Sequence, residues 1–494
     1  MTGTSAPGTS GTAGSPSVPV DLLVVGFGAA GAAAAITARR LGASVLVVEK
    51  QPAAAHTPST RMSGGLIMTV TDAEDGTSYL GACAGGMVPE PVSRAWATRA
   101  ADLLGWLAVV APDLALAPIG GAEVPDLVGA AAITVVQPGS SARRLDAGSG
   151  AGRAVYDALV AAAARHEVPV RWDSPVRRLR RHATSGVIEG VELVSGEYIA
   201  AKVVLLACGG YEFDETMKQD HLRAYPIHFY GNPGNTGDGV RMAQDVGADL
   251  WHMNQMIGRA IGRFELPDGS PLGFIIDIAP PGYVITDRHG DRFADESPQA
   301  KLLHGFYYSL LAFDHERGEY PRIPCYWFFD ERRRLAGPLT HPNIGACAVG
   351  LYDWSPDNSK EIESGWISRG DTVEEAARNA GLDDPARAAE TVAEYNDACA
   401  AGRDPLGRPP ETLVPLLEPP FYCVRLWPGG SNTSGGPRRD NHARVLDVFG
   451  APIPGLLAAG ELGQPVGLRY PADGSNLSEA LCFGQIAAET AVKG

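Results

Sequence analysis

The chain has 494 residues, a length that normally divides into more than one hydrophobic core, so we expect two domains. Its hydrophobic fraction of 45% and charged fraction of 20% are typical of a globular protein and argue against intrinsic disorder. The formal net charge of -16 argues against a nucleic-acid partner, because phosphate binding needs a basic surface. No apolar run reaches the ~18 residues that a membrane-spanning helix requires.

The seven cysteines are scattered along the chain. Their number is odd and none of them forms a CxxC pair, which argues against a disulfide framework and against a zinc site. We therefore expect no bound metal and a reducing compartment. Residues 1–19 are rich in Gly, Ser, Thr and Pro and lack the basic start and apolar core of a signal peptide. They predict a disordered tail on a cytoplasmic protein.

The segment after this tail predicts a βαβ unit. Residues 20–25 form an apolar run that is typical of a buried parallel strand. An alanine-rich helix is expected to follow and to end near Leu41. A second strand is expected over residues 43–48, and it leads directly into Glu49.

Three glycines stand between the first strand and the helix in GxGxxG spacing. Gly26 allows a tight turn, Gly28 lets the backbone approach a pyrophosphate, and Gly31 lets the helix pack closely on the strand. The helix N-terminus offers free N–H groups to the phosphates. Glu49 is placed to accept hydrogen bonds from ribose hydroxyls. With strand, helix, strand and acid all in place, the pattern predicts a dinucleotide site.

Farther along, the chain changes character twice. A helix is expected over residues 152–166, and a buried strand precedes the glycine pair of "LLACGG". The following region has more aromatic residues, more charge and proline-rich turns, which indicates a second domain. Short β-rich runs then return, and a last helix is expected over residues 477–492. The predicted division is a first domain segment over 20–263, an inserted domain over 264–416, and a second segment of the first domain over 417–494.

A set of motifs occurs in this order: "GFGAAG", "TRMSGG", "LLACGGY", "GNTGDGVRMAQDVGA", "GDRFADES", "ARVLDVFGAPIPGLLAAGE" and "GSNLSEALCFGQIAAETA". The series resembles the succinate dehydrogenase and fumarate reductase flavoprotein superfamily, and most of all its 3-ketosteroid Δ1-dehydrogenase-like desaturases. The resemblance covers about residues 20–494. It implies FAD as the cofactor. It also implies an α/β fold in which a Rossmann-type FAD-binding domain is built from both chain ends and an α+β cap, or catalytic, domain is inserted between them.

The resemblance also implies where FAD makes its contacts. The pyrophosphate is expected at the first glycine turn, the adenosine ribose at Glu49, the adenine at Val176, and the flavin beside Ser63 and at the start of the last helix. A helix N-terminus there would stabilise negative charge on reduced flavin. The implied cofactor contacts are Gly26, Gly28, Ala30, Gly31, Glu49, Lys50, Ser63, Gly64, Gly65, Val176, Ala207, Gly209, Asp238, Gly460, Glu461, Ser475, Asn476 and Leu477.

The mode of FAD attachment is a separate question. Some members of the superfamily attach FAD to a histidine shortly before the first GG pair. Here His56 lies eight residues before Gly64, which is farther than that arrangement suggests. We therefore expect non-covalent FAD. The chain has no second dinucleotide fingerprint, which disfavours direct use of NAD(P)H.

The stretch "YPADG", from Tyr470 to Gly474, carries the expected substrate chemistry. The ketosteroid enzymes have a Tyr-x-x-x-Gly ahead of the flavin helix, and the tyrosine hydroxyl and the glycine N–H both hydrogen-bond the substrate ketone. Two donors on one carbonyl oxygen stabilise the enolate character that develops when an α-proton leaves. The resemblance therefore implies that Tyr470 and Gly474 are catalytic, whereas a packed loop tyrosine followed by a turn glycine is the structural alternative.

The proton acceptor is not found at its usual place. In the ketosteroid enzymes a tyrosine follows a proline shortly after the RFxxE motif, but here Gln299 stands in that position and cannot act as a base. The nearby candidates are His304, Tyr307 and Tyr308, each of which could equally be a packed side chain. The departure leaves the steroid substrate open as well as the base.

Dicarboxylate reduction is disfavoured by two absent groups. The superfamily's fumarate reductases carry a proton-donating arginine where this chain has Ala300, and a histidine where it has Asn432. Arg469, next to Tyr470, is a candidate for bidentate binding of a substrate carboxylate, as in an oxocyclohexanecarboxylate, although a solvated arginine is the simpler interpretation. We expect Arg469, Gln299 and Asn432 at the substrate.

The leading hypothesis is an FAD-dependent desaturase that introduces a C=C bond α,β to the ketone of a cyclic substrate. Hydride would go to flavin N5 and the α-proton to a protein base, and reduced flavin would pass electrons to a quinone-like acceptor or to O2. The first alternative is the reverse reaction, reduction of an activated C=C bond. The second is a flavin electron-transfer subunit without a substrate of its own.

Overall fold

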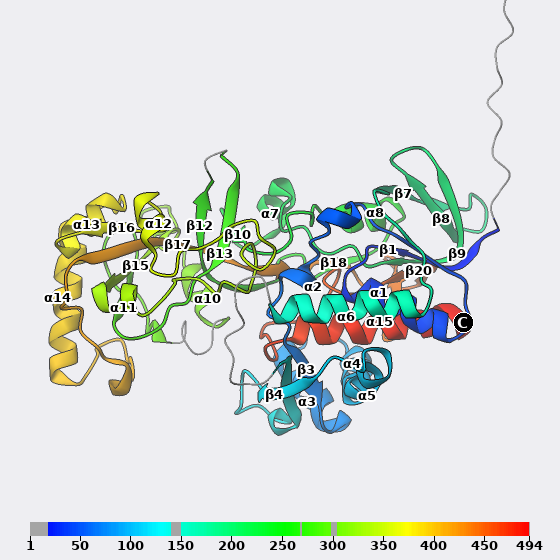
Figure 1. Ribbon diagram of the computed structural model, residues 1–494, viewed down its shortest axis with the longest axis horizontal. Coiled ribbons are helices and arrows are strands. Elements are labelled where there is room, and N and C mark those ends of the chain that lie inside the picture. Colours follow the sequence, from blue (N-terminus) through cyan, green and yellow to red (C-terminus); the bar gives the residue numbers. More distant parts are fainter. Residues whose placement is uncertain (1–17, 140–149, 267–268, 298–303, 494) are drawn as a thin grey trace, which may run out of the picture.

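The computed structural model describes residues 18–139, 150–266, 269–297 and 304–493. The predicted tail over residues 1–19 therefore lies mostly outside the described residues, as does Gln299. The described chain contains two large sheets. One lies with the long helices α1 and α15, and the other lies at the opposite end of the molecule with a group of short helices (Figure 1).

The first large sheet is built from both ends of the chain. Its central strand β1 (Val20–Val25) pairs in parallel with β2 (Val45–Val48) and with β9 (Tyr198–Leu206). On its other side β9 pairs in parallel with β20 (Pro452–Ala458) from the C-terminal part. This topology confirms the expected Rossmann-type domain. The other strands of this eight-stranded sheet are β6 (Val170–Arg171), β7 (Val176–Arg181), β8 (Ile188–Leu193) and β19 (Arg444–Leu446).

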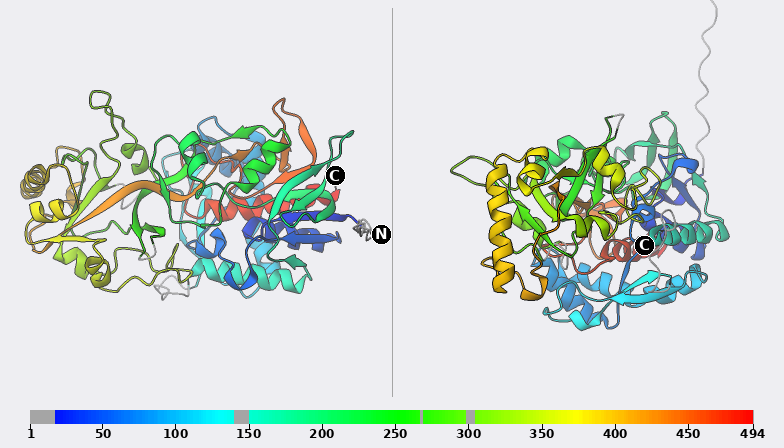
Figure 2. Two further views of the ribbon diagram at one scale, coloured as in Figure 1. Left: turned by 90° about the horizontal axis from the view of Figure 1, so that it is seen from above. Right: turned by 60° about the vertical axis from the view of Figure 1, so that its left-hand side comes forward.

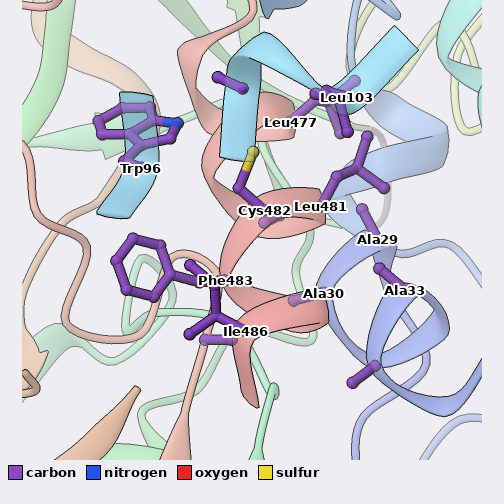
Figure 3. Packing of buried hydrophobic residues seen from close by; sticks show 14 of the residues in the cluster. Ala29, Ala30, Ala33, Trp96, Leu103, Leu477, Leu481, Cys482, Phe483 and Ile486 are labelled. Atoms are coloured by element: carbon purple, nitrogen blue, oxygen red, sulfur yellow. The ribbon is translucent and has the colours of Figure 1, made fainter. Parts of the chain in front are cut away.

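Two helices from opposite ends of the chain lie side by side against this sheet. α1 (Ala29–Arg40) and α15 (Ser475–Lys493) contact each other along their length (Figures 1 and 3). A Cβ at Gly484 of α15 would lie only 2.5 Å from the carbonyl oxygen of Ala30, so the close approach of the two backbones requires glycine there. α6 (Ala151–Arg165) packs against α1.

The other face of α15 is covered by a small antiparallel unit. Trp96, Leu103, Leu481 and Phe483 belong to this core (Figure 3), and the Trp96 indole N–H donates to the hydroxyl of Ser478 at 3.1 Å. The unit consists of β3 (Ile67–Val70), β4 (Leu116–Gly120), β5 (Ile133–Pro138), α3 (Ala73–Ala84), α4 (Glu90–Ala101) and α5 (Leu103–Val110).

The second large sheet has seven strands, and β17 (Phe421–Thr433) is its longest. In Figure 2 this orange strand runs from the far end of the molecule toward the first sheet. Its neighbour β12 (Met256–Glu265) crosses the predicted boundary between residues 263 and 264, and the predicted domain limits remain a prediction. The other strands are β10 (His228–Phe229), β13 (Pro271–Ile275), β14 (Tyr283–Thr286), β15 (Cys325–Asp330) and β16 (Ser368–Gly370).

Several short helices and the longer α14 (Pro385–Ala401) belong to the part of the chain that forms this second sheet. Those of the cap are α10 (Phe306–Leu310), α11 (Glu331–Leu335), α12 (Ser359–Glu363), α13 (Val373–Asn379), α14 and the 3₁₀ helix η3 (Pro410–Thr412). The remaining elements are η1 (Ala53–Ala55), α2 (Ser59–Met62), η2 (Ala130–Ala132), α7 (Glu215–His221), α8 (Asp238–Asp245) and the paired strands β11 (Leu250–Trp251) and β18 (Gly436–Pro437).

The sequence-based elements differ from the observed ones only at their ends. The first helix ends at Arg40 rather than Leu41, and the last begins at Ser475 rather than Leu477. The second difference matters for the site, because it places Ser475 and Asn476 in the first turn of α15. No helix within the described residues is both long enough and apolar enough to cross a membrane.

Candidate active site

The turn between β1 and α1 has the geometry that its glycines predict. Gly26 has φ +102°, and a Cβ there would lie 2.5 Å from the carbonyl oxygen of Ala207. At Gly31 a Cβ would lie 2.0 Å from the carbonyl oxygen of Gly26. At Gly28, however, the nearest atom would be the Thr60 hydroxyl at 3.6 Å. Gly26 and Gly31 therefore allow close packing of the backbone, while Gly28 keeps open space in front of the helix N-terminus.

That open space belongs to a cleft that runs along the carboxyl ends of the first sheet's strands. The N–H of Ala29 donates to the Thr60 hydroxyl at 2.9 Å, and the first intrahelical bond runs from Ala32 to Gly28. The N–H groups of Ala30 and Gly31 therefore have no partner within the helix. An open backbone cradle at a helix N-terminus fits the pyrophosphate of FAD.

Glu49 lies at the wall of the same cleft, with 7% of its surface exposed. Its carboxylate accepts hydrogen bonds of 2.9 Å from the N–H groups of Phe27 and Gln51, and it lies 3.5 Å from Nε2 of His56. Burial opposes the charge, but His56 and the two amides outweigh burial and lower the pKa of Glu49. The ionised carboxylate keeps lone pairs for the ribose hydroxyls of FAD.

The adenine end of the cleft is polar on one side. Lys50 forms an ion pair of 2.6 Å with Asp238 and donates to the Thr236 hydroxyl at 3.1 Å. Val176 supplies an apolar wall. Lys50, Asp238 and Val176 thus line one cleft, although 188 positions separate Lys50 from Asp238 in the sequence.

A third carboxyl group, that of Glu461, faces the middle of the cleft. It accepts hydrogen bonds of 3.2 Å from the Ser59 hydroxyl and from the side-chain amide of Asn235. Burial, and next the negative charge of Glu212, raise the pKa of Glu461 to about 8. A protonated carboxyl group can donate a hydrogen bond to the cofactor. The sequence-based prediction did not include Ser59, Thr60 or Asn235, because isolated Ser, Thr and Asn residues carry no spacing signal.

Most of the predicted cofactor residues line this cleft. They are Gly26, Gly28, Ala30, Glu49, Lys50, Ser63, Val176, Ala207, Gly209, Asp238, Gly460, Glu461, Asn476 and Leu477. Gly31, Gly64, Gly65 and Ser475 lie directly behind this lining. Gly65 has φ +66°, and a Cβ there would lie 2.2 Å from the backbone of Ala151 in α6. Ser475 is buried, and its hydroxyl accepts from the Ala472 N–H at 3.1 Å.

His56 has both ring nitrogens engaged by protein groups. Nδ1 lies 2.6 Å from the Tyr156 hydroxyl, and Nε2 lies 3.5 Å from the Glu49 carboxylate. The imidazole is 2% exposed and lines the adenosine side of the cleft next to Glu49. In this position His56 holds Glu49 in its charged form.

Tyr470 lies just before α15 and is bonded to Asn476, which lines the cleft. Tyr470 is 9% exposed, and its hydroxyl oxygen accepts the N–H of Asn476 at 3.2 Å, which leaves the hydroxyl proton free to donate. Burial holds the pKa of Tyr470 well above its ordinary value, so the hydroxyl stays protonated. Gly474 has φ +82°, and within the described part of the chain no protein acceptor takes its N–H.

His304 lies against Tyr470, with ring centroids 4.6 Å apart. Nδ1 of His304 lies 2.9 and 3.0 Å from the two carboxylate oxygens of Glu123. The Glu123 N–H in turn donates to the Pro471 carbonyl at 3.0 Å, so the glutamate is fastened to the Tyr470 loop. Glu123 and His304 line a cavity together with Leu66 and Asp473. Glu123 was missed by the sequence-based prediction, because nothing in its local sequence marks it.

The two neighbouring tyrosines differ: among the described residues the buried Tyr307 hydroxyl has no hydrogen-bond partner, whereas the Tyr308 hydroxyl has one. Tyr307 is 3% exposed, and its ring packs against Gly258. The hydroxyl of Tyr308 donates to the Leu468 carbonyl at 2.7 Å. Of the three candidate bases, His304 is therefore the one whose ring contacts that of Tyr470.

The predicted substrate residues are placed differently from one another. Arg469 is exposed, and its backbone N–H donates to the Cys83 carbonyl at 3.1 Å. Asn432 is fully buried and accepts from the Asn476 amide at 2.7 Å, so it supports the first turn of α15. Gln299 and Ala300 lie outside the described residues.

A family model described as FAD binding domain matches residues 21–477. The chain belongs to this FAD-binding family. A curated relative, 4-oxocyclohexanecarboxylate 2-dehydrogenase of Sinomonas cyclohexanicum, is 28% identical over 97% of this chain and 93% of its own length. The 3-oxosteroid 1-dehydrogenase of Mycobacterium tuberculosis is 29% identical over 95% of this chain and 97% of its own length.

Among solved structures, the 3-ketosteroid delta1-dehydrogenase of Sterolibacterium denitrificans is similar in fold, with a TM-score of 0.82. It is 23% identical, and the match covers 96% of this chain and 99% of that one. These findings confirm the expected fold and superfamily and FAD as the cofactor. They also confirm the expected class of an FAD-dependent oxidoreductase that acts on CH–CH groups.

Proposed function

We propose that this protein is an FAD-dependent desaturase of cyclic ketones. The observation that carries the proposal is the grouping of Tyr470, the free Gly474 N–H and the His304–Glu123 pair at the start of α15. A hydroxyl and an amide are the two donors that a ketone oxygen needs, and a histidine is the group that most often accepts a proton in enzymes.

In this mechanism the ketone oxygen accepts hydrogen bonds from the Tyr470 hydroxyl and the Gly474 N–H. The two donors stabilise the negative charge that develops on oxygen as the α C–H bond breaks. His304 accepts the α-proton at Nε2, because Nδ1 faces the Glu123 carboxylate and is held by it in the N–H form. Glu123 thus acts as a positioning residue for the base.

When bound, FAD would accept at its N5 atom the hydride that leaves the β-carbon of the substrate. The C=C bond forms between the α- and β-carbons as the two hydrogens depart, so electrons and protons balance. Asn476 and Leu477, in the first turn of α15, line the cleft at the flavin end, where the helix N-terminus favours negative charge on the reduced cofactor. The final electron acceptor in our proposal is a quinone or O2.

We further propose that FAD is held without a covalent bond. The support is that His56, the histidine before the first GG pair, contacts Tyr156 and Glu49 with its two nitrogens and lies on the adenosine side of the cleft. Acid precipitation of the yellow protein is expected to release all of its flavin into the supernatant. Yellow colour that stays in the pellet would contradict this part of the proposal.

The test of the proposed reaction is anaerobic mixing of the oxidised holoenzyme with saturated cyclic ketones while the flavin absorbance is followed. We expect bleaching, with formation of one enone for each flavin reduced. Flavin that stays oxidised with ketones, but reoxidises rapidly after chemical reduction when an enone is added, would assign the reverse reaction. Absence of both responses would assign an electron-transfer role.

A further inference from the structure

Arg259 of β12 is a buried cation that has no counter-ion among the residues that the structure describes. Its exposed fraction is 3%, and its Nε atom is buried and has no hydrogen-bond partner. Within the described ranges of the chain, its guanidinium forms no ion pair and no hydrogen bond with a protein group. A charge in this position costs free energy unless an anion pairs with it.

The other arginines that are equally buried in the described chain all have partners. Arg439 forms an ion pair of 2.6 Å with Glu479, and Arg408 lies 3.5 Å from Glu296 and donates to the Tyr283 carbonyl at 2.7 Å. Arg333 lies 3.5 Å from Asp277 and donates to its carbonyl at 2.7 Å. The fold thus pairs its other buried arginines with protein groups. This indicates that the partner of Arg259 is a ligand from outside the chain.

The strand register fixes the side of the sheet to which Arg259 points. At the preceding residue, Gly258, a Cβ would lie 2.4 Å from the ring of Tyr307, so that face is turned toward α10. Because neighbouring residues of a strand point to opposite faces, Arg259 projects from the other face. On that face it is paired with Gly429 of β17, which is itself paired with His228 of β10.

The same face of the sheet continues into the wall of the FAD cleft. Two positions after Gly429 along β17 stands Ser431, and two positions after His228 stands Tyr230. Both Ser431 and Tyr230 line the cleft. Two residues of a strand span about 7 Å, so Gly429, the strand partner of Arg259, lies about that far along β17 from Ser431 in the cleft wall.

We propose that Arg259 is the anion subsite of the substrate pocket and binds a carboxylate carried by the cyclic ketone. This inference rests on the proposed function and narrows its substrate class to ring ketones with a carboxylate, as opposed to uncharged ketosteroids. Arg259 does not line the FAD cleft itself, and the pyrophosphate cradle is at the far turn before α1. A planar guanidinium pairs with a carboxylate through two parallel hydrogen bonds. Arg259 takes the role that the sequence suggested for the exposed Arg469.

The first experiment measures anion binding without turnover. Cyclohexanecarboxylate has no ketone and cannot reduce the flavin, so its affinity for the oxidised holoenzyme is read from the flavin spectrum and by calorimetry. Arg259→Met is expected to weaken its binding by ~100-fold or more, as loss of a partner from a buried charge pair does, and Arg259→Lys is expected to weaken it less.

Arg263→Met is the matched control, because Arg263 projects from the same face of β12 but already pairs with Glu265 at 2.8 Å. We expect this variant to bind cyclohexanecarboxylate with the wild-type affinity. The binding of cyclohexanecarboxylate is also measured in sodium chloride and in sodium phosphate at equal ionic strength. A site for any small anion would lose cyclohexanecarboxylate to these salts, whereas a carboxylate subsite would keep it. Displacement of cyclohexanecarboxylate by chloride at equal concentration, or equal affinity in the wild type and Arg259→Met, would overturn the proposal.

The second experiment compares 4-oxocyclohexanecarboxylate with its methyl ester as reductants of the flavin. The ratio of kcat/KM for the acid to that for the ester is expected to fall by ~100-fold in Arg259→Met and to stay constant in Arg263→Met. If neutral ketones alone reduce the wild-type flavin, the desaturase proposal stands and the anion subsite is wrong. If Arg259→Met loses carboxylate binding but no ketone reduces the flavin, the subsite stands and the desaturase proposal is wrong.

Discussion

The imidazole of His304 lies 2.9 Å from the carboxylate of Glu123, although 181 residues separate them in the sequence. The pair is fastened to the Tyr470 loop by the bond from the Glu123 N–H to the Pro471 carbonyl, and by contact between the His304 and Tyr470 rings. The contact between His304 and Glu123 joins the cap to the small antiparallel unit, next to the proposed ketone site. In our proposal this pair supplies the base, since the resemblance places Gln299 where a tyrosine is usual.

The assignment of the base predicts a graded response to substitution. His304→Ala is expected to lower the rate of flavin reduction by ~10²–10⁴-fold, the usual contribution of general base catalysis. Glu123→Gln keeps the shape of the pair but removes its charge, so we expect a smaller loss with little change in KM. Stopped-flow reduction by the cyclic ketone is the measurement.

The controls for this prediction are Tyr307→Phe and Tyr308→Phe. The hydroxyl of Tyr308 is bonded to the Leu468 carbonyl, and the Tyr307 ring packs against Gly258, so both variants are expected to reduce flavin within about twofold of the wild type. A large loss in either variant, together with a fast His304→Ala variant, would move the base from His304 to that tyrosine.

The ketone site makes a second prediction. Tyr470→Phe keeps the packed ring but removes one of the two donors to the ketone oxygen, so kcat is expected to fall by ~10²–10³-fold, the typical cost of one such donor. The FAD content should be unchanged, because the bond that the Tyr470 hydroxyl loses is one from the backbone N–H of Asn476, and the Asn476 side chain is not involved in it. Turnover is measured with the ketone and FAD content by absorbance. Full turnover in Tyr470→Phe would refute the donor role.

The two kinds of glycine in the first turn predict different phenotypes. Gly28→Ala places a methyl group in open space, 3.6 Å from its nearest protein neighbour, so the apoprotein should fold normally and bind FAD at least ~10-fold more weakly. Gly31→Ala places a methyl group 2.0 Å from the Gly26 carbonyl oxygen and should destabilise the apoprotein itself. Thermal unfolding and FAD titration of the two apoproteins separate these effects. Normal FAD affinity in Gly28→Ala would contradict the cradle.

Glu461 predicts a pH dependence of apoprotein stability. Burial raises its pKa in the folded state from 4.5 to about 8, so folding favours the protonated form. That contribution is complete below pH 4.5 and is lost as the pH rises through about 8. Glu461→Gln mimics the protonated form, so its melting temperature relative to the wild type should rise between pH 5.5 and pH 8.5. A constant difference over this range would contradict the raised pKa.

The first βαβ unit and the last helix were predictable because their signals are local. The glycine spacing, the apolar strand and Glu49 all lie within 30 residues, and the close packing of Gly31 on Gly26 follows from that spacing. The resemblance extended this to the distant cleft residues Val176 and Asp238. Ser59 and Asn235 were not predicted, because their hydrogen bonds to Glu461 depend only on the folded topology.

The proposed catalytic residues were harder to predict from the sequence than the cofactor residues. The Glu123–His304 pair joins segments far apart in sequence, and no spacing rule connects them. Arg259 carried a readable signal, since it is the charged residue in the otherwise apolar and glycine-rich stretch "MIGRAIG". That stretch was not assigned as a strand, so its burial was not foreseen. Arg469 was a candidate because it adjoins Tyr470, but the folded loop leaves Arg469 exposed and Tyr470 buried.

We propose that the site of Tyr470 and His304 removes two hydrogens from a cyclic ketone. The most direct measurement is anaerobic mixing of the holoenzyme with 4-oxocyclohexanecarboxylate, with flavin absorbance and enone product followed together. We expect loss of the oxidised flavin spectrum and formation of one enone per flavin, and, with an α-deuterated ketone, loss of the deuterium to solvent. A flavin that stays fully oxidised with this ketone, with its methyl ester and with a 3-oxosteroid would contradict it.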